Sequence, residues 1–263
     1  MPPITQGTLT WYFKDVDWKN KFLVGSLFML IATFVPGVGL LGYPVVYGYA
    51  LVVMRATMRA EPLTLPKWER YGELFVDGFK AGLAAFGYLI PGIIAIVGAY
   101  GLIIVAIVLE STLWIPTTRA GEPAIPWLLL IGNAGLFLAL GFAMLWFIAT
   151  VIPIAIAVGQ YARTGQIRAG YRLREVWDIL RANIGGFVLA LFVFWAIAIG
   201  ISFLLQIVYM TIILCCLLPF ISAPISFYLT LNWAYLFGLA YREGARKAGI
   251  ALEPVELAAS SKK

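Results

Sequence analysis

The sequence predicts an all-α, polytopic helical membrane protein with about six membrane segments and two amphipathic helices in the plane of the membrane. Of its 263 residues, 62% are hydrophobic and only 12% are charged, whereas a soluble domain carries about 25% charged residues. Four stretches contain no charged residue: 22–54, 81–109, 123–162 and 182–241. Each exceeds the roughly 20 apolar residues that a membrane helix needs, so a water-soluble protein is excluded.

The charge-free stretches divide into segments at their prolines and glycines. The expected membrane segments are 21–35, 41–58, 81–109, 127–160, 184–216 and 223–241. In the longest stretch the break is expected between Pro219 and Pro224, because proline interrupts helices. The first segment rises only about 20 Å at 1.5 Å per residue, so it either spans a thinned bilayer or re-enters.

A second break is predicted directly after the first segment. Its residues are Pro36, Gly37, Gly39, Gly42 and Pro44. This pattern is not expected to continue a regular helix. A tight turn at the outer surface is the favoured interpretation, and the alternative is a broken helix that builds an ion or substrate site.

The distribution of basic residues orients the segments. With the N-terminus inside, 18 of the 19 basic residues lie on the inner side and only Arg119 lies outside. The positive-inside rule therefore predicts a multi-pass protein of the cell (plasma) membrane with both termini in the cytoplasm. We expect a cytoplasmic segment over 1–20, a single transmembrane domain over 21–250 and a mobile C-terminal tail over 251–263.

Two inner segments, 66–80 and 171–181, have apolar residues at helical spacing opposite a charged face. They are expected to lie along the inner membrane surface, with Trp68 and Trp177 at the level of the head groups. The basic residues beside the second segment suit anionic lipid head groups. They are Arg163, Arg168, Arg172 and Arg174.

The two inner segments also suggest an internal repeat. Aligning Asp77 with Asp178 aligns Lys80 with Arg181, 101 residues further on. The repeat units, about 41–110 and 127–216, share the order crossing, basic turn, in-plane helix, crossing. This order is typical of a parallel repeat. The alternative to a repeat is a chance similarity, because any membrane segment that enters the cytoplasm ends in an aromatic residue and an arginine.

Residues that carry chemistry are few. The chain has no histidine, which is the commonest general base and metal ligand. Its two cysteines, Cys215 and Cys216, are adjacent in an apolar run and are expected to be small buried hydrophobes. We therefore expect no enzyme activity, no catalytic residue, no metal and no cofactor.

Polar groups inside the segments are the remaining candidates. Gln206, Asn232 and Asn133 are candidates for a polar cavity, and the alternative is hydrogen bonding between helices. Five inner carboxylates could gather if the two repeat units face one another, and the alternative is a solvated face with salt bridges. These carboxylates belong to Glu69, Glu73, Asp77, Glu175 and Asp178.

Three parts of the sequence carry a family resemblance. They are the aromatic run 11–18, the glycine–proline segment 36–44, and the motifs at 66–69 and 72–78. With these residues the chain resembles the domain of unknown function 4013 family of bacterial and archaeal membrane proteins. It resembles more loosely the non-catalytic membrane domain of glycerophosphodiester phosphodiesterases. The resemblance implies one compact domain with short loops and supplies no catalytic residues.

These observations favour a non-enzymatic scaffold or complex subunit in the bilayer. The expected partners are membrane lipids, preferentially anionic on the inner face, and either further copies of the chain or another protein, with no nucleic acid. The alternative is a small transporter, channel or lipid-handling protein whose path lies at the repeat interface.

Overall fold

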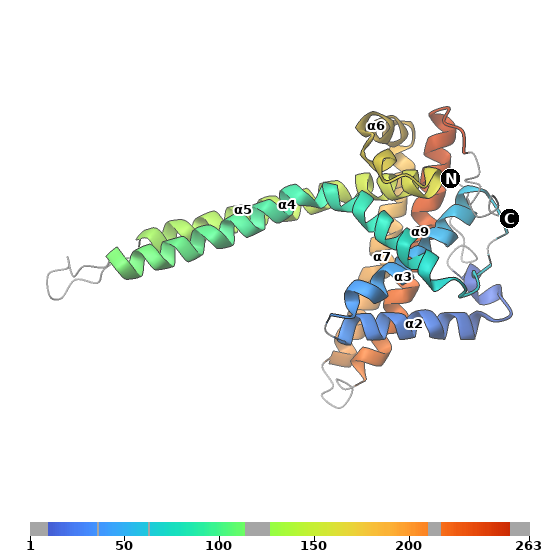
Figure 1. The fold of residues 1–263 in the computed structure, drawn as a ribbon, viewed down its shortest axis with the longest axis horizontal. Coiled ribbons are helices and arrows are strands. Elements are labelled where there is room, and N and C mark those ends of the chain that lie inside the picture. The colour runs from blue at the N-terminus through green and yellow to red at the C-terminus, as the bar shows by residue number, and fades with distance from the viewer. Residues whose placement is uncertain (1–9, 36, 63, 114–126, 210–216, 253–263) are drawn as a thin grey trace. The chain divides into compact units, whose positions relative to one another are not determined.

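The computed structural model describes residues 10–35, 37–62, 64–113, 127–209 and 217–252. Throughout these ranges the regular structure is helical, which confirms the predicted all-α class (Figure 1). The α-helices are α2 (Trp18–Phe34), α3 (Gly39–Met58), α4 (Tyr71–Leu113), α5 (Trp127–Thr164), α6 (Leu173–Ala182), α7 (Ile184–Tyr209) and α9 (Leu218–Lys247). Two short 3-10 helices are η1 (Trp11–Lys14) and η2 (Ile167–Tyr171).

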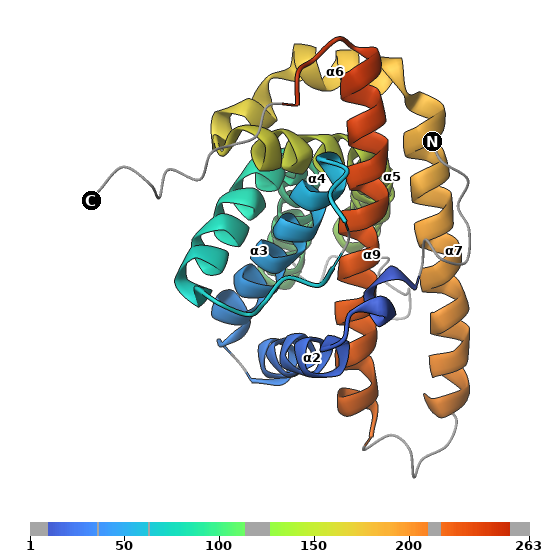
Figure 2. The same cartoon turned by 90° about the vertical axis from the view of Figure 1, so that its right-hand side faces the viewer.

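The chain forms two compact units. Unit 1 comprises residues 1–85 and 152–263, and unit 2 comprises residues 86–151. Unit 1 is built around α9, which contacts α2, α3, α6 and α7 (Figure 2). Every residue from Ala234 to Tyr241 is buried. A helix that is apolar on all faces belongs inside a core, so α9 is the central helix of unit 1.

Unit 2 is a helical hairpin in which α4 and α5 run side by side (Figure 1). The indole nitrogen of Trp146 donates a hydrogen bond to the carbonyl oxygen of Tyr88 at 2.8 Å. A β-carbon on Gly92 would lie 2.7 Å from the ring of Phe147, so the glycine makes room for that ring. Away from this contact, large apolar side chains such as Phe137 are exposed.

Three helices of the described part are long and apolar enough to cross a membrane: Tyr71–Leu109, Trp127–Thr164 and Ile184–Gln206. They coincide with three of the predicted segments. Helices α2, α3 and α9 occupy the places of the segments 21–35, 41–58 and 223–241. That these three also cross the bilayer, and the total of six segments, stay predictions.

The structure corrects the expectation of a separate in-plane helix over 66–80. Helix α4 begins at Tyr71 and continues without a break to Leu113. Gly82 does not end the helix, because an interior glycine costs only about 1 kcal/mol relative to alanine. The second inner segment does form a helix of its own, α6, which ends before Asn183. The two inner segments differ in this respect, and the internal repeat stays a prediction.

The break after α2 is shorter than the sequence suggested. Gly37 has a positive φ of 81°, but α3 begins at Gly39 and includes Gly42 and Pro44. The two helical glycines serve close packing: a β-carbon on Gly42 would lie 2.6 Å from the β-carbon of Ala32 in α2. Pro36 lies outside the described residues.

The break expected between Pro219 and Pro224 is also corrected, because α9 already begins at Leu218. Pro219 occupies the first turn of α9, where the missing N–H would have no helical acceptor. Pro224 lies within the helix. The predicted features at Cys215, Cys216 and Arg119, and the tail from residue 253 onward, lie outside the described residues.

Candidate functional site

Two glycines bring α3 and α4 into backbone contact within unit 1. A β-carbon on Gly78 would overlap the carbonyl oxygen of Pro44 and lie 2.6 Å from the amide nitrogen of Gly48. A β-carbon on Gly48 would lie 2.6 Å from the carbonyl carbon of Leu74. Small residues permit this close approach of helices. The crossing therefore positions the end of α3 beside the start of α4.

An ion pair joins the same two helices, with Arg55 about two turns after Gly48 and Asp77 directly before Gly78. Arg55 Nη1 lies 2.7 Å from Asp77 Oδ2, and Arg55 Nε donates to the carbonyl oxygen of Ala162 in α5 at 3.1 Å. The hydroxyl of Tyr161 donates to the other carboxylate oxygen at 3.0 Å. The side chains of Arg55 and Asp77 are only 13% and 28% exposed. Hydrogen bonds to ionised groups are the stronger ones, so this cluster fastens three helices together.

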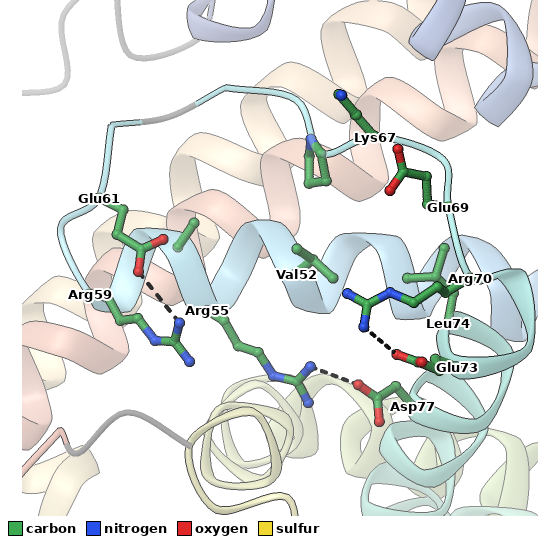
Figure 3. Close-up of a pocket in the computed structure, with 12 residues that line it drawn as sticks. Val52, Arg55, Arg59, Glu61, Lys67, Glu69, Arg70, Glu73, Leu74 and Asp77 are labelled. Atoms are coloured by element: carbon green, nitrogen blue, oxygen red, sulfur yellow. Dashed lines mark hydrogen bonds and ion pairs between the residues drawn. The ribbon is translucent and has the colours of Figure 1, made fainter. Parts of the chain in front are cut away.

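A cavity of about 300 Å³ opens beside this ion pair (Figure 3). Its walls come from the end of α3, the connection over 59–70 and the first turns of α4. The lining residues are Val52, Arg55, Ala56, Arg59, Glu61, Pro66, Lys67, Glu69, Arg70, Glu73, Leu74 and Asp77. Four of them are basic and four are acidic, and Figure 3 shows the two signs interspersed around the opening.

The charged residues at the rim of the cavity are exposed. Arg70 and Glu73 form a 3.1 Å ion pair in which both side chains are 59% exposed. Arg59 and Glu61 form a longer pair at 3.4 Å. Such surface pairs contribute only about 0–1 kcal/mol. The rim can therefore exchange partners, whereas the Arg55–Asp77 pair is part of the framework.

The connection that closes the cavity is held by residues before and within α2. Asp15 Oδ2 accepts a hydrogen bond from the amide of Leu65 at 3.1 Å and pairs with Lys21 Nζ at 2.8 Å. Burial opposes ionisation of Asp15, but the hydrogen bonds from Lys21 and from the amides of Asp17 and Leu65 hold its pKa below the usual range.

Trp68 adds a second anchor to this connection. Its indole nitrogen donates to the carbonyl oxygen of Lys21 at 2.7 Å, and its ring stacks on Tyr49 with centroids 4.0 Å apart. The predicted head-group tryptophan is therefore half-buried against α2 and α3.

A second charged cluster lies at the end of α5. Arg163 Nη2 pairs with Glu175 Oε2 at 3.2 Å, and Arg172 pairs with the other oxygen at 3.1 Å. The side chain of Arg163 is only 14% exposed. Glu175 therefore joins α5 to α6, while Glu69, Glu73 and Asp77 line the cavity. The five carboxylates named from the sequence thus form separate groups, and Asp178 is exposed on α6.

The other predicted inner-surface residues lie around η2 and α6 and are exposed. They are Arg168, Arg172, Arg174 and Trp177. The guanidinium carbon of Arg181 lies 4.7 Å from the centroid of the Trp177 ring, a cation–π arrangement. On the side of α6 that faces the protein core, Val176 and Ile179 are buried. Contact of these residues with lipid stays a prediction.

The three predicted amides occupy different environments. Asn232 is completely buried in α9, and its Nδ2 donates to the carbonyl oxygen of Tyr228 at 2.9 Å. Gln206 is exposed on α7. Asn133 belongs to unit 2, where its Nδ2 donates to the carbonyl oxygen of Leu129 at 2.8 Å. Two of the three therefore bond within their own helix, and their role in a polar cavity stays a prediction.

Sequence reasoning missed the basic half of the cavity. Arg55, Arg59, Lys67 and Arg70 were counted only as inner-side charges, yet they line the cavity beside the predicted carboxylates. The sequence does indicate that the two residues could meet, because Arg55 directly follows one charge-free stretch and Asp77 lies four residues before the next. Charges at these two positions are predicted to flank the membrane on the same side.

Among the described residues, no group of three or more His, Cys, Asp and Glu side chains is arranged to hold a metal ion. Fold and composition define the class as an all-helical protein with membrane-capable helices. Residues 28–216 match the family model described as "Protein of unknown function (DUF4013)", which is more than half of the chain, so the protein belongs to this family. No curated protein and no solved structure matches the chain. The looser resemblance to the glycerophosphodiester phosphodiesterase membrane domain stays a prediction.

Proposed function

We propose that the protein is a non-enzymatic scaffold or complex subunit of the cell membrane, with both termini in the cytoplasm. The observation that carries this proposal is a set of ion pairs that join separate elements of unit 1. Arg55–Asp77, Arg163–Glu175 and Lys21–Asp15 each join different elements. These ion pairs therefore stabilise the arrangement of the helix ends. Unit 1 presents to a partner a polar surface whose shape is fixed by these pairs.

The apolar surface of unit 2 supports the membrane part of the proposal. Phe137 and Leu138 are 71% and 76% exposed, and each helix of the hairpin belongs to a membrane-capable span. Large exposed apolar patches on a protein mark sites of contact with lipid or with other proteins. Of these two, we propose that the hydrocarbon of the bilayer covers this surface.

Lipid contacts at the inner surface follow from the same arrangement. Arg168, Arg172 and Arg174 are exposed near Trp177 on η2 and α6. Exposed arginines near an aromatic side chain at a membrane surface attract anionic head groups. We propose that this surface binds anionic lipid of the inner leaflet.

A lipid-handling protein is the second candidate function, and the charged cavity between α3 and α4 favours it. Mass spectrometry of the intact, detergent-purified chain separates the two candidates. We expect a complex of fixed stoichiometry above the 28.9 kDa of one chain, either a homo-oligomer or a pair with a second protein. A solute or lipid flux in reconstituted vesicles from a chain that stays monomeric would contradict the scaffold proposal.

A further inference from the structure

The charged cavity is not needed by a scaffold, since the framework ion pair alone would fasten the helices. We propose that this cavity binds a compact zwitterion carrying a phosphate and a primary ammonium, the chemistry of an ethanolamine phospholipid head group. Four features of the cavity favour this ligand: the charge balance of its lining, the exposed ion pairs of its rim, the lack of aromatic residues among the described lining residues, and its depth on α4.

The balance of charge favours a ligand without net charge. The lining has four basic and four acidic side chains, so a purely anionic head group would meet as many repelling as attracting groups. Guanidinium groups bind phosphate through paired hydrogen bonds. A primary ammonium has three N–H donors and is suited to carboxylates. A zwitterion presents both groups at once.

The rim provides groups that can change partners. Arg70 and Glu73 are paired but 59% exposed, and exposed pairs are weak. Lys67 and Glu69 belong to the connection just before Arg70 and also line the cavity (Figure 3), and neither side chain forms an ion pair with another described residue. A phosphate bound by basic lining residues such as Arg70, with the ammonium bound by carboxylates such as Glu69 and Glu73, replaces one weak pair by several charged contacts.

The lining also discriminates between zwitterionic head groups. Quaternary ammonium groups are recognised by aromatic cages, but none of the described residues that line the cavity is aromatic. A choline group has no N–H to give to Glu69 or Glu73. The volume of about 300 Å³ is at the small end of ligand sites, which suits a small head group.

The position of the cavity points to a membrane lipid as the source. Helix α4 has 43 residues, whereas about 20 cross the hydrocarbon core. Its charge-free part starts at Ala81, four residues after Asp77, a rise of about 6 Å. The cavity therefore lies at head-group depth, and its lining includes the apolar side chains of Val52 and Leu74. This step rests on the membrane location in the proposed function.

The test measures lipid retention by the purified full chain with native mass spectrometry. Dioleoyl lipids with ethanolamine, choline and glycerol head groups are offered in equal amounts. We expect one ethanolamine lipid per chain to be retained with about ten-fold preference over the choline lipid, as expected for losing charge-assisted hydrogen bonds. Glu69→Gln should reduce this preference about ten-fold, whereas Arg70→Gln should reduce the retention of the ethanolamine lipid about ten-fold, because its guanidinium is assigned to the phosphate that all three lipids share.

Matched controls carry the same charge changes outside the cavity. Asp178→Asn on α6 and Arg246→Gln on α9, where the Arg246 side chain is 74% exposed, should leave both the retention of the ethanolamine lipid and the ethanolamine preference unchanged. Soluble phosphoethanolamine is the competitor: displacement of the lipid shows that the zwitterion alone is recognised, and binding without displacement assigns the ligand to the intact lipid. Equal retention of the ethanolamine and choline lipids, or an equal loss in the controls, would overturn the proposal.

The lipid result is separable from the function proposed above. Retention is measured in detergent, so it does not depend on whether the chain forms a complex. An oligomer without ethanolamine preference removes only the cavity ligand. A monomer with that preference removes only the scaffold role.

Discussion

Gly78→Val is expected to destabilise the folded state of unit 1 more than any other single substitution considered. The new side chain would overlap the Pro44 carbonyl oxygen at its first carbon and approach the Gly48 amide nitrogen. Backbone atoms in two helices cannot rotate aside as a flexible side chain can. Overpacking of a core costs about 1–3 kcal/mol and occasionally more. Because backbone blocks this site, we expect at least about 3 kcal/mol.

The measurement is the midpoint of thermal unfolding, together with the yield of monodisperse protein in detergent. Gly82→Val is the matched control, because Gly82 also lies inside α4 and a β-carbon there meets nothing within 4 Å. It should unfold at or slightly above the wild-type temperature, since valine is a better helix former than glycine. Equal unfolding temperatures for the two variants would contradict the close crossing of α3 and α4.

Asp77→Asn is expected to have the second largest effect. It removes the charge that faces Arg55 and leaves a guanidinium that is only 13% exposed. Breaking a fully buried pair costs about 3–5 kcal/mol, and the partial exposure of Asp77 reduces this to about 2 kcal/mol. The free energy of unfolding, measured by denaturant titration in detergent, should fall by this amount.

Glu73→Gln is the control for Asp77→Asn, because Glu73 lies on the same helix and its pair with Arg70 is more exposed, at 59% for both side chains. It should change the free energy of unfolding by less than about 1 kcal/mol. The double variant Arg55→Gln, Asp77→Asn completes a cycle, and the two single effects should not add. Additive effects, or a cost no larger than that of Glu73→Gln, would show that the pair does not fasten α3 to α4.

The all-α class, the three membrane-capable helices and much of the helix order could be predicted because they depend on local composition. Absence of charge over 81–109, 123–162 and 182–241 locates α4, α5 and the α7–α9 region whatever the tertiary structure is. The short helix α6 was predicted from its charged and apolar faces. The bounds of the helices were less predictable, because a glycine such as Gly82 or a proline such as Pro219 is tolerated where its position in the helix suits it.

The site could be predicted only in part, because its contacts join residues far apart in the sequence. Periodicity shows that Asp77 lies on the polar face of a helix, but not that Arg55 is the residue opposite it. In the same way, nothing local to Trp68 indicates that its ring stacks on Tyr49 instead of facing the membrane surface. Gly48 and Gly78 gain their meaning only from the crossing of two helices.

Chemical accessibility of single cysteines in intact cells tests the central proposal that the charged cavity faces the cytoplasm at the membrane surface. The background carries Cys215→Ala and Cys216→Ala, and the test positions are Glu69→Cys, Arg174→Cys and Arg119→Cys. A membrane-impermeant maleimide should label only Arg119→Cys in intact cells and all three after the membrane is disrupted. Labelling of Glu69→Cys in intact cells would contradict the proposed cytoplasmic location of the cavity.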